Sequence, residues 1–299
     1  MNTALRNNDI SQRLQGGKRR LGMPLPDTQA HQPWVSIITI VWNNVNLLEH
    51  TIKNVLSQTY TNIEYIIIDG ASTDGTLDII RKYDSQIGYW QSEPDAGLYD
   101  AMNKGLHTAR GQYVWFINSG DMMYEPTTLS LAIAQNHTAD ILYGDTVFMN
   151  SHWQVLAGRH RYTPQQVPAQ LSLKALHYGM CVCHQSLLVK RSIAPLYQLK
   201  YKINADYDWE IACVKNASTI HNTHQILSKF LTGGVATQQI KKGLQERWHV
   251  MLHHFGWRQT LSSHVVIAFR GVAYYSRYLL RSILLQVSKK IGLLSDDKN

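Results

Sequence analysis

Short hydrophobic runs alternate with amphipathic segments through the first half of the chain, and the hydrophobic runs end on polar residues. The continuous β-branched runs predict buried strands of a parallel sheet. These predicted strands are 35–41, 63–69, 87–93 and 113–118. The segments between them repeat apolar residues at helical spacing, which predicts helices at 47–59, 76–83 and 98–110. Strands that alternate with helices predict an α/β fold on a mostly parallel, Rossmann-like sheet flanked by helices.

The regular alternation of predicted strands and helices ends after residue 140. Strand candidates there are 140–149 and 183–191, a loop enters a helix within 203–216, and 241–295 has a mainly helical pattern. Residues 1–33 are polar and lack apolar periodicity, which is typical of a disordered segment. The predicted organisation is a disordered leader at 1–33, a main domain at 34–240 and a basic, mainly helical C-terminal extension at 241–299.

The net charge of +8 belongs to the two ends of the chain. Residues 1–33 carry +3, residues 241–299 carry +7, and the region between them carries −2. A nucleic-acid-binding domain places positive charge on its working face, so this distribution argues against nucleic acid as a partner. It fits an extension that meets an anionic membrane surface.

No hydrophobic run approaches the roughly 20 residues of a membrane span, and the N-terminus lacks the apolar segment of a signal peptide. The three cysteines, Cys181, Cys183 and Cys213, cannot all pair with one another. We expect buried, reduced thiols and hence a cytoplasmic protein. The basic extension predicts a peripheral position on the inner face of the plasma membrane.

Polar groups gather where the predicted strands end. These ends are 41–44, 69–70, 92–95 and 118–121. Ligands of open parallel sheets bind beyond the carboxyl ends of the strands, so these groups are candidates for a site. The first strand is followed by neither a dinucleotide-binding glycine loop nor a P-loop. Carboxylates and amides fit instead a divalent cation that bridges protein oxygens to a diphosphate.

Four stretches of the sequence resemble the inverting family-2 nucleotide-sugar glycosyltransferases, which have the GT-A fold. They are VSIITIVWNN, VLSQTYTNIEYIIIDGASTDGT, SEPDAGLYDAMNKG and GQYVWFINSGD. The resemblance covers roughly 34–240 and is closest to the bacterial polysaccharide-biosynthesis branch. It implies transfer of a sugar from a nucleotide-diphosphate donor to a hydroxyl of a glycan or a polyprenyl-diphosphate-linked acceptor.

The resemblance also implies roles for residues of the first half. Asp69 should contact the donor's base or ribose, although Gly70 stands where the commoner family form has a second aspartate. Asp95 matches the donor-side aspartate of the third strand, and Lys104 should face the diphosphate.

The stretch INSGD takes the place of the family's D-x-D motif. Asn118 replaces its first acid and Gly120 its third position, so Asp121 is the carboxylate left in this stretch. The resemblance therefore implies that Asp121 holds Mg²⁺ or Mn²⁺, with Asn118 beside it in the donor site.

The second half should supply the base, because inversion needs an acceptor hydroxyl that loses its proton during attack. The stretch NADYDWE resembles the family's acid motif, with Asp206 at the position of the base. Asp208 is the fallback, and an ordinary acid in the first turn of a helix explains it equally well. His184 and Gln185 match a His-Gln pair that the branch places near the diphosphate or the acceptor.

The segment 265–290 predicts a basic amphipathic helix that binds an anionic membrane in its plane. Its arginines are Arg270, Arg277 and Arg281, and its other face carries Leu280, Ile283, Leu284 and Val287. A helix packed on the main domain, or a seam between two copies, explains the same pattern.

Two other functions compete with sugar transfer. A sugar-nucleotide pyrophosphorylase shares the sheet, but Asn43 and Asn44 stand where its phosphate loop would begin. A non-catalytic sugar-nucleotide sensor or scaffold would explain Gly70, Asn118 and Ala205, which depart from the family pattern. Zinc sites at Cys181, Cys183 and His184, or at His249, His253 and His254, lack a complete set of ligands.

Overall fold

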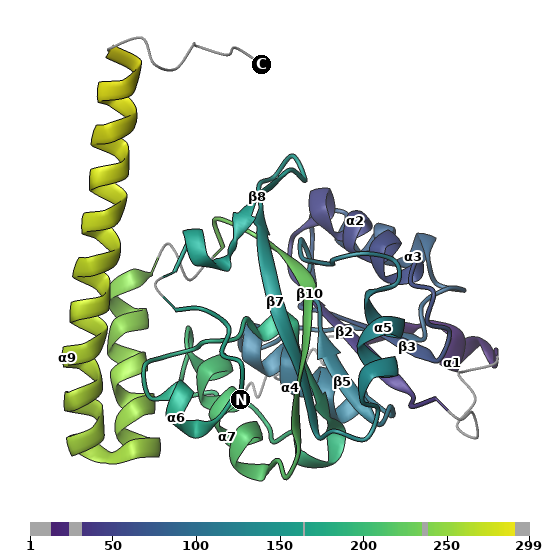
Figure 1. The fold of residues 1–299 in the computed structure, drawn as a ribbon. Helices are drawn as coiled ribbons and strands as arrows, with labels where there is room; N and C mark the ends of the chain where they lie inside the picture. The colour runs from purple at the N-terminus through teal and green to yellow at the C-terminus, as the bar shows by residue number, and fades with distance from the viewer. Residues whose placement is uncertain (1–12, 24–31, 164, 235–238, 291–299) are drawn as a thin grey trace, which may run out of the picture.

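The computed structural model describes residues 13–23, 32–163, 165–234 and 239–290. These residues form a ten-stranded sheet with helices on both faces, and a long C-terminal helix rises beside it (Figure 1). The strands are β1 Leu14–Gly16, β2 Val35–Val41, β3 Ile63–Asp69, β4 Tyr89–Ser92, β5 Tyr113–Phe116, β6 Met122–Met123, β7 Ile141–Met149, β8 Val155–Gly158, β9 Leu187–Lys190 and β10 Ile220–Leu231. The α-helices are α1 Lys18–Leu21, α2 Val45–Leu56, α3 Thr76–Lys82, α4 Leu98–Thr108, α5 Thr128–Gln135, α6 Leu173–Leu176, α7 Ala205–Asn216 and α9 Ile240–Lys290. The 3₁₀ turns are η1 Arg159–Arg161, η2 His184–Ser186 and η3 Arg191–Ile193.

The sheet has the strand order β1-β4-β3-β2-β5-β9-β7-β10-β6, with β8 paired to β7. The four strands β4, β3, β2 and β5 are parallel to one another, as the sequence predicts. β9 runs antiparallel to β5 and to β7, while β7 and β10 are again parallel. The fold is therefore a mixed sheet with a parallel core.

Alternate side chains of the central strands pack on opposite faces of the sheet. Ile37 and Ile67 join a core with residues of α2, α3 and α5. Ile38 and Ile68 join a second core with residues of α4 and α7. The strands are mostly apolar because both faces are covered, which is why their sequences form nearly continuous hydrophobic runs.

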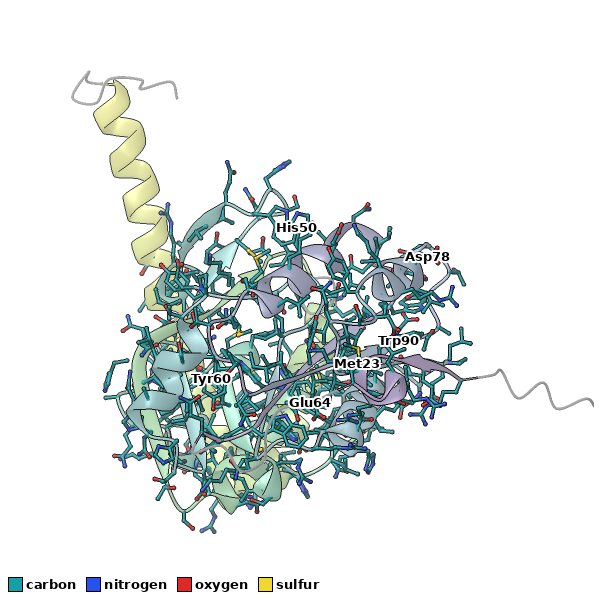
Figure 2. The ribbon with its side chains drawn as sticks, turned by 90° about the vertical axis from the view of Figure 1, so that its right-hand side faces the viewer. Met23, His50, Tyr60, Glu64, Asp78 and Trp90 are labelled. Carbon is teal, nitrogen blue, oxygen red and sulfur yellow. The ribbon has the colours of Figure 1, made fainter. Side chains whose placement is uncertain are left out.

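The prediction of a disordered leader is wrong for residues 13–23. β1 pairs with β4 and adds an antiparallel edge strand (Figure 2, where Trp90 of β4 and Glu64 are labelled). Arg19 of α1 forms an ion pair with Glu64, whose side chain is fully buried. A buried carboxylate needs a charged partner, and the leader supplies it. The remaining parts of 1–33, namely 1–12 and 24–31, lie outside the described residues.

Besides β1, three strands were not predicted: β6, β8 and β10. β10 is twelve residues long, but its sequence, IHNTHQILSKFL, is too polar to show a strand pattern. It pairs with β7 over its length, with irregularities between Asn222 and Ser228. The short strands β6 and β8 give no periodic signal.

The C-terminal extension is helical, as predicted, and α9 bends at Gly256. This glycine has φ 76° and ψ 170°, which breaks the helix into two parts that run side by side (Figure 1). The ring of Trp248 in the first part meets the ring of His264 in the second, with centroids 4.6 Å apart. No helix within the described residues has the length and apolar character to cross a bilayer.

Candidate functional site

The parallel core brings the ends of four strands to one edge of the sheet. β4, β3, β2 and β5 are neighbours in that order, and each runs in the same direction. The loops that follow them contain the polar residues predicted to bind the donor. The sequence prediction that these groups gather at the carboxyl edge is therefore confirmed.

Asp69 holds its own loop together. Its side chain is fully buried, and its carboxylate accepts hydrogen bonds from the hydroxyls of Ser72 and Ser92, both at 2.5 Å. The Ser72 amide donates to the same carboxylate at 3.1 Å. Burial and three hydrogen bonds occupy the carboxylate in this conformation, and the contact of Asp69 with the donor stays a prediction. Asp69 shapes the loop whose other residues face the edge.

Gly70 makes room for Asp95. A Cβ atom placed on Gly70 would lie 2.5 Å from Asp95 Oδ2 and 3.3 Å from Trp42 Cδ1. Asp95 is half-buried, and burial raises the pKa of its carboxyl. Its other oxygen accepts the Gly97 amide at 2.8 Å. At the position where the family pattern has a second aspartate, this chain has Gly70, and the carboxylate of Asp95 from the loop after the neighbouring strand lies beside it.

Lys104 ties the loop after β4 to α4. Its ammonium group donates to the Pro94 carbonyl at 2.7 Å and pairs with Glu93 at 3.0 Å. It lies close to Asp100 as well, at 3.8 Å. In this conformation Lys104 positions the Asp95 loop, and its role toward a diphosphate stays a prediction.

Asp121 lies in a buried, hydrogen-bonded position next to β10. Its Oδ2 accepts Gln185 Nε2 at 2.8 Å, and its Oδ1 accepts the Leu231 amide at 3.0 Å. Burial raises the pKa of Asp121 to about 7, and the two hydrogen bonds partly oppose this shift. The Asn118 side-chain oxygen nearby in the same loop is buried and accepts no hydrogen bond from the described residues. Gln185 was predicted for this region, and the structure brings it to Asp121.

Asp206 stands in the first turn of α7, where the helix dipole favours a negative charge. Its Oδ1 accepts the Tyr207 amide at 2.9 Å and faces the Tyr99 hydroxyl of α4 at 3.3 Å. Burial raises the pKa of Asp206 to about 6, and the charge of Glu246 adds to the shift. Because its pKa is raised, this carboxylate is a stronger base than the carboxylate of an exposed aspartate.

His184 lies in a buried cluster of aromatic rings. It is 5% exposed and packs among the rings of Phe116, Tyr197 and Trp209, with centroids 5.1 to 5.9 Å away. Its Nε2 shares a 2.6 Å hydrogen bond with the Tyr197 hydroxyl. Burial lowers the pKa of His184 to about 4, so the ring is neutral at physiological pH. His184 is therefore part of the core, and its predicted place beside the diphosphate or acceptor stays a prediction.

That aromatic core links the Asp121 side of the site to the Asp206 side. The Tyr197 ring stacks on the Tyr99 ring, with centroids 5.7 Å apart, and Tyr99 contacts Asp206. Gln185, directly after His184, contacts Asp121. The packing therefore fixes both acids relative to one rigid aromatic group.

Asp208 faces away from Asp206 and joins α7 to α9. It is 5% exposed, and its Oδ1 lies 2.9 Å from His254 Nε2. This contact with His254 is structural, and the fallback assignment of Asp208 as base or acceptor contact stays a prediction. The zinc alternatives fail, since the three cysteines are free and buried and the described residues form no cluster of three metal-ligating side chains.

The residues at the Asp121 position fit a cation that is held mainly by a bound diphosphate. Mg²⁺ is commonly bound by one or two protein oxygens together with substrate phosphates. Asp121 supplies a carboxylate with free lone pairs, and the unpartnered Asn118 oxygen supplies a neutral ligand. The donor set is thus suited to a hard divalent cation, although it is too small to hold one alone.

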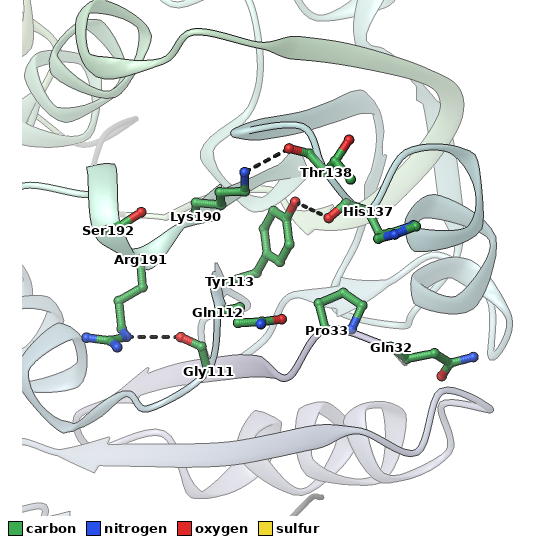
Figure 3. Close-up of a pocket in the computed structure, with 10 residues that line it drawn as sticks. All are labelled: Gln32, Pro33, Gly111, Gln112, Tyr113, His137, Thr138, Lys190, Arg191 and Ser192. Atoms are coloured by element: carbon green, nitrogen blue, oxygen red, sulfur yellow. Dashed lines mark hydrogen bonds between the residues drawn. The ribbon is translucent and has the colours of Figure 1, made fainter. Parts of the chain in front are cut away.

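A cavity of about 480 Å³ lies at the opposite edge of the sheet, at the start of β5 (Figure 3). Tyr113 and Lys190 line it, and the Tyr113 hydroxyl and the Lys190 ammonium group hydrogen-bond to backbone carbonyls of residues 137–139. None of the predicted site residues reaches this cavity. It lies away from the carboxyl ends where an open sheet binds its ligand.

Sequence reasoning missed two side chains of the edge. Trp42 follows β2 and is 69% exposed beside Gly70, where its ring offers a platform for a base or a sugar. Tyr99 contacts the predicted base from α4. An aromatic residue directly after a buried strand was a signal for Trp42, whereas nothing in the local sequence indicated that Tyr99 meets Asp206.

Comparison with known proteins identifies one family. The profile described as glycosyl transferase family 2 matches residues 36–196, more than half of the chain. A PGL/p-HBAD biosynthesis glycosyltransferase of Mycobacterium bovis is 27% identical over 227 residues, which cover 72% of this chain and 84% of the relative. A putative teichuronic acid biosynthesis glycosyltransferase, TuaG of Bacillus subtilis, is 41% identical over 93 residues, or 30% of this chain and 37% of the relative.

Solved structures of low sequence identity share the fold. S. aureus TarS 1–349 in complex with UDP-GlcNAc has a TM-score of 0.57 at 16% identity, covering 81% of this chain and 72% of TarS. The mannosyltransferase PcManGT of Pyrobaculum calidifontis, in complex with GDP-Man and Mn²⁺, has a TM-score of 0.52 at 16% identity. The match covers 93% of this chain and 86% of that protein. The GT-A-like sheet predicted from sequence is therefore confirmed.

Proposed function

The chain belongs to glycosyl transferase family 2, and from that membership we propose an inverting, metal-dependent transfer of a sugar from a nucleotide diphosphate to an acceptor hydroxyl. One observation carries the proposal. Two acids with raised pKa values, Asp121 and Asp206, come from distant parts of the chain and are fixed around one aromatic group. Such perturbed acids are typical of functional sites.

The donor is proposed to lie across the carboxyl edge of the sheet. Trp42 and Asp95 would contact its nucleoside end, where Gly70 leaves space. Asn118 and Asp121 would hold Mg²⁺ or Mn²⁺ against its diphosphate, and the cation would neutralise the charge of the departing group. The complexes of TarS with UDP-GlcNAc and of PcManGT with GDP-Man and Mn²⁺ support a donor of this class.

Asp206 is proposed as the base that takes the proton from the acceptor hydroxyl. Its raised pKa matches the task, because a base works best when its pKa approaches the working pH. Asp206→Asn should lower turnover by about 10²–10⁴-fold while donor binding persists. Retained turnover in this variant would exclude Asp206 as the base.

The acceptor is proposed to be a glycan or a polyprenyl-diphosphate-linked sugar of a cell-surface polysaccharide, reached from the inner face of the plasma membrane. The names of the relatives, in PGL/p-HBAD biosynthesis and teichuronic acid biosynthesis, support this class. We assign membrane contact to an apolar stripe on α9, formed by Trp257, Leu261, Val265, Phe269 and Val272. These side chains are 52–76% exposed.

A thermal-shift screen tests the proposal. UDP-, GDP-, dTDP- and CMP-sugars are added with and without Mn²⁺, because a ligand of the native state raises the melting temperature. A shift for one nucleotide, increased by Mn²⁺ and lost in Asp121→Ala, is expected. A shift without turnover would favour a sugar-nucleotide-binding scaffold, and no shift with any donor would contradict the proposed donor site.

A further inference from the structure

Glu210 is a buried acid without an ordinary partner. It lies on α7 and is 2% exposed, and neither of its carboxylate oxygens accepts a hydrogen bond within 3.5 Å from the described residues. No described cation lies within 4 Å of it. Leaving an acid in such a place is costly, so each instance in a folded protein needs an explanation.

Glu210 follows Asp206 by one helical turn, at the spacing i, i+4, which places both acids on the same face of α7. Burial raises the pKa of Glu210 to about 8, and the negative charge of Asp206 contributes to this shift, while the positive charge of Arg159 opposes it.

The groups around the two acids come from several elements. Arg159 of η1 is 7% exposed and leaves its Nε without a partner. Cys181 and Cys213 are buried near Glu210, and its charge raises the pKa of both thiols. Tyr99 of α4 and Glu246 of α9 act on Asp206 from the other side. The charges of Glu210 and Arg247 also act on Tyr207, in opposite directions.

We propose that Asp206 and Glu210 form a coupled acid pair that carries one proton in the working enzyme, with Glu210 as a positioning residue. Glu210 keeps that proton while Asp206 is ionised, so that the fold holds one negative charge at this place. When Asp206 takes a proton from the acceptor, the charge beside Glu210 disappears. Two like-charged sites so close titrate as a pair. This inference rests on Asp206 as the proposed base.

A double-mutant cycle in unfolding tests the pair without any activity. Wild type, Asp206→Asn, Glu210→Gln and the double variant are unfolded in urea at pH 5 and pH 8. The raised pKa of Glu210 means that its folded state keeps a proton that the unfolded chain releases above about 4.5. Wild type should therefore lose stability as pH rises from about 4.5 to 8, and Glu210→Gln should lose less, because the raised pKa values of Asp121 and Asp206 still contribute to the loss.

The expected result is coupling at pH 8 and additivity at pH 5. At pH 8 Glu210→Gln should raise the folding equilibrium constant by on the order of a thousand-fold relative to wild type, and by less when Asp206 is already replaced. Asp208→Asn is the matched control, because Asp208 is equally buried on α7 but pairs with His254. Its cycle with Glu210→Gln should be additive at both pH values.

The outcomes separate this inference from the proposed function. Additive changes at pH 8 would overturn the pair even if Asp206→Asn abolished turnover. Coupling with retained turnover in Asp206→Asn would keep the pair and exclude Asp206 as the base. If Glu210→Gln does not fold, the loss of stability between pH 5 and 8 is compared in wild type and Asp206→Asn, and an unchanged slope would overturn the pair. With turnover available, Glu210→Gln should also remove an apparent pKa near 8 from the rate profile.

Discussion

At the scale of single residues, the site depends on a missing side chain at Gly70. We predict that Gly70→Ala displaces Asp95, because the new Cβ would lie 2.5 Å from Asp95 Oδ2. Overpacking of this kind costs about 1–3 kcal/mol of stability. The larger effect should be on the nucleotide, whose thermal shift should shrink or vanish. Gly271→Ala on α9 is the control, since open space surrounds that position. Full donor binding by Gly70→Ala would contradict the assignment of Asp95.

The raised pKa of Asp121 predicts that the affinity for the metal ion depends on pH. Its pKa is raised to about 7, and a cation binds the ionised carboxylate. Below pH 7 protons compete with Mn²⁺, and its affinity should fall by about tenfold per pH unit. The measurement is the Mn²⁺-dependent part of the thermal shift with a nucleotide sugar from pH 5.5 to 8.5. A nucleotide sugar is used because a terminal phosphate would itself titrate near pH 6.

Asp121→Asn is the control for that titration and should abolish the metal effect at every pH. Asn118→Ala should weaken it without moving its midpoint, because Asn118 has no titratable group. A metal effect that is flat between pH 5.5 and 8.5 would show that Asp121 is ionised throughout or is not a ligand.

At the scale of elements, the short N-terminal segment is held by one buried ion pair. Arg19→Ala leaves the fully buried Glu64 without its charged partner, although Ser36 and the Arg110 amide still hydrogen-bond to it. Removing one member of a buried pair typically costs ~3–5 kcal/mol. Urea unfolding should show this loss for Arg19→Ala. The neighbouring Arg20 is exposed, so Arg20→Ala should change stability little. Equal effects of the two variants would show that α1 is not anchored through Arg19.

The secondary-structure elements also show which parts of the fold can be predicted from the sequence. β2 and β3 were predicted with their observed bounds, because both faces of these strands are buried and most of their residues are apolar. β10 was missed because it is polar and half-exposed, and its place depends on pairing with β7. The segment 14–21 was missed because its order comes from a partner, Glu64, that is distant in sequence.

The same distinction applies to the candidate site. Asp121 and Asp206 stand in motifs with a fixed local spacing, so a resemblance could mark them. The fate of His184 and Asp208 depends on what packs against them, namely Tyr197 and His254. Burial and tertiary contacts of this kind leave no trace in a local pattern. Gly70 appeared as a departure from the family, and the structure accounts for it through Asp95.

At the scale of the whole molecule, α9 joins the main domain to a second surface. Val250 and Met251 of its first part are buried in the core. Glu246 accepts the amides of residues 202–204 at 2.7–3.1 Å, just before the α7 turn that contains Asp206. Arg270 lies over the Tyr178 ring, 4.5 Å from its centroid. The Tyr274 hydroxyl donates to the Arg161 carbonyl, so one face of the helix packs on the domain as far as Tyr274, and the apolar stripe is left outside.

Charge indicates what covers that stripe. Residues 247–295 contain seven Lys and Arg and no Asp or Glu. Two copies meeting along such helices would bring like charges together, whereas an anionic bilayer would attract them. The side chains of Arg277 and Arg281, and of the apolar residues predicted beside them, lie outside the described residues. The stripe visible in the structure extends the predicted membrane face toward Gly256.

We predict that the protein sediments with vesicles of phosphatidylcholine and phosphatidylglycerol and only weakly with phosphatidylcholine alone. Trp257→Ser and Phe269→Ser should each weaken binding by about tenfold or more, because burying such a side chain is worth ~1.5–3 kcal/mol. Leu131→Ser, at a 52% exposed position of α5, is the matched control and should bind as wild type does. High salt should weaken binding to the anionic vesicles, since exposed charges are screened. If the stripe variants bind equally well but change from dimer to monomer in sedimentation, the stripe is instead a contact between two copies of the chain.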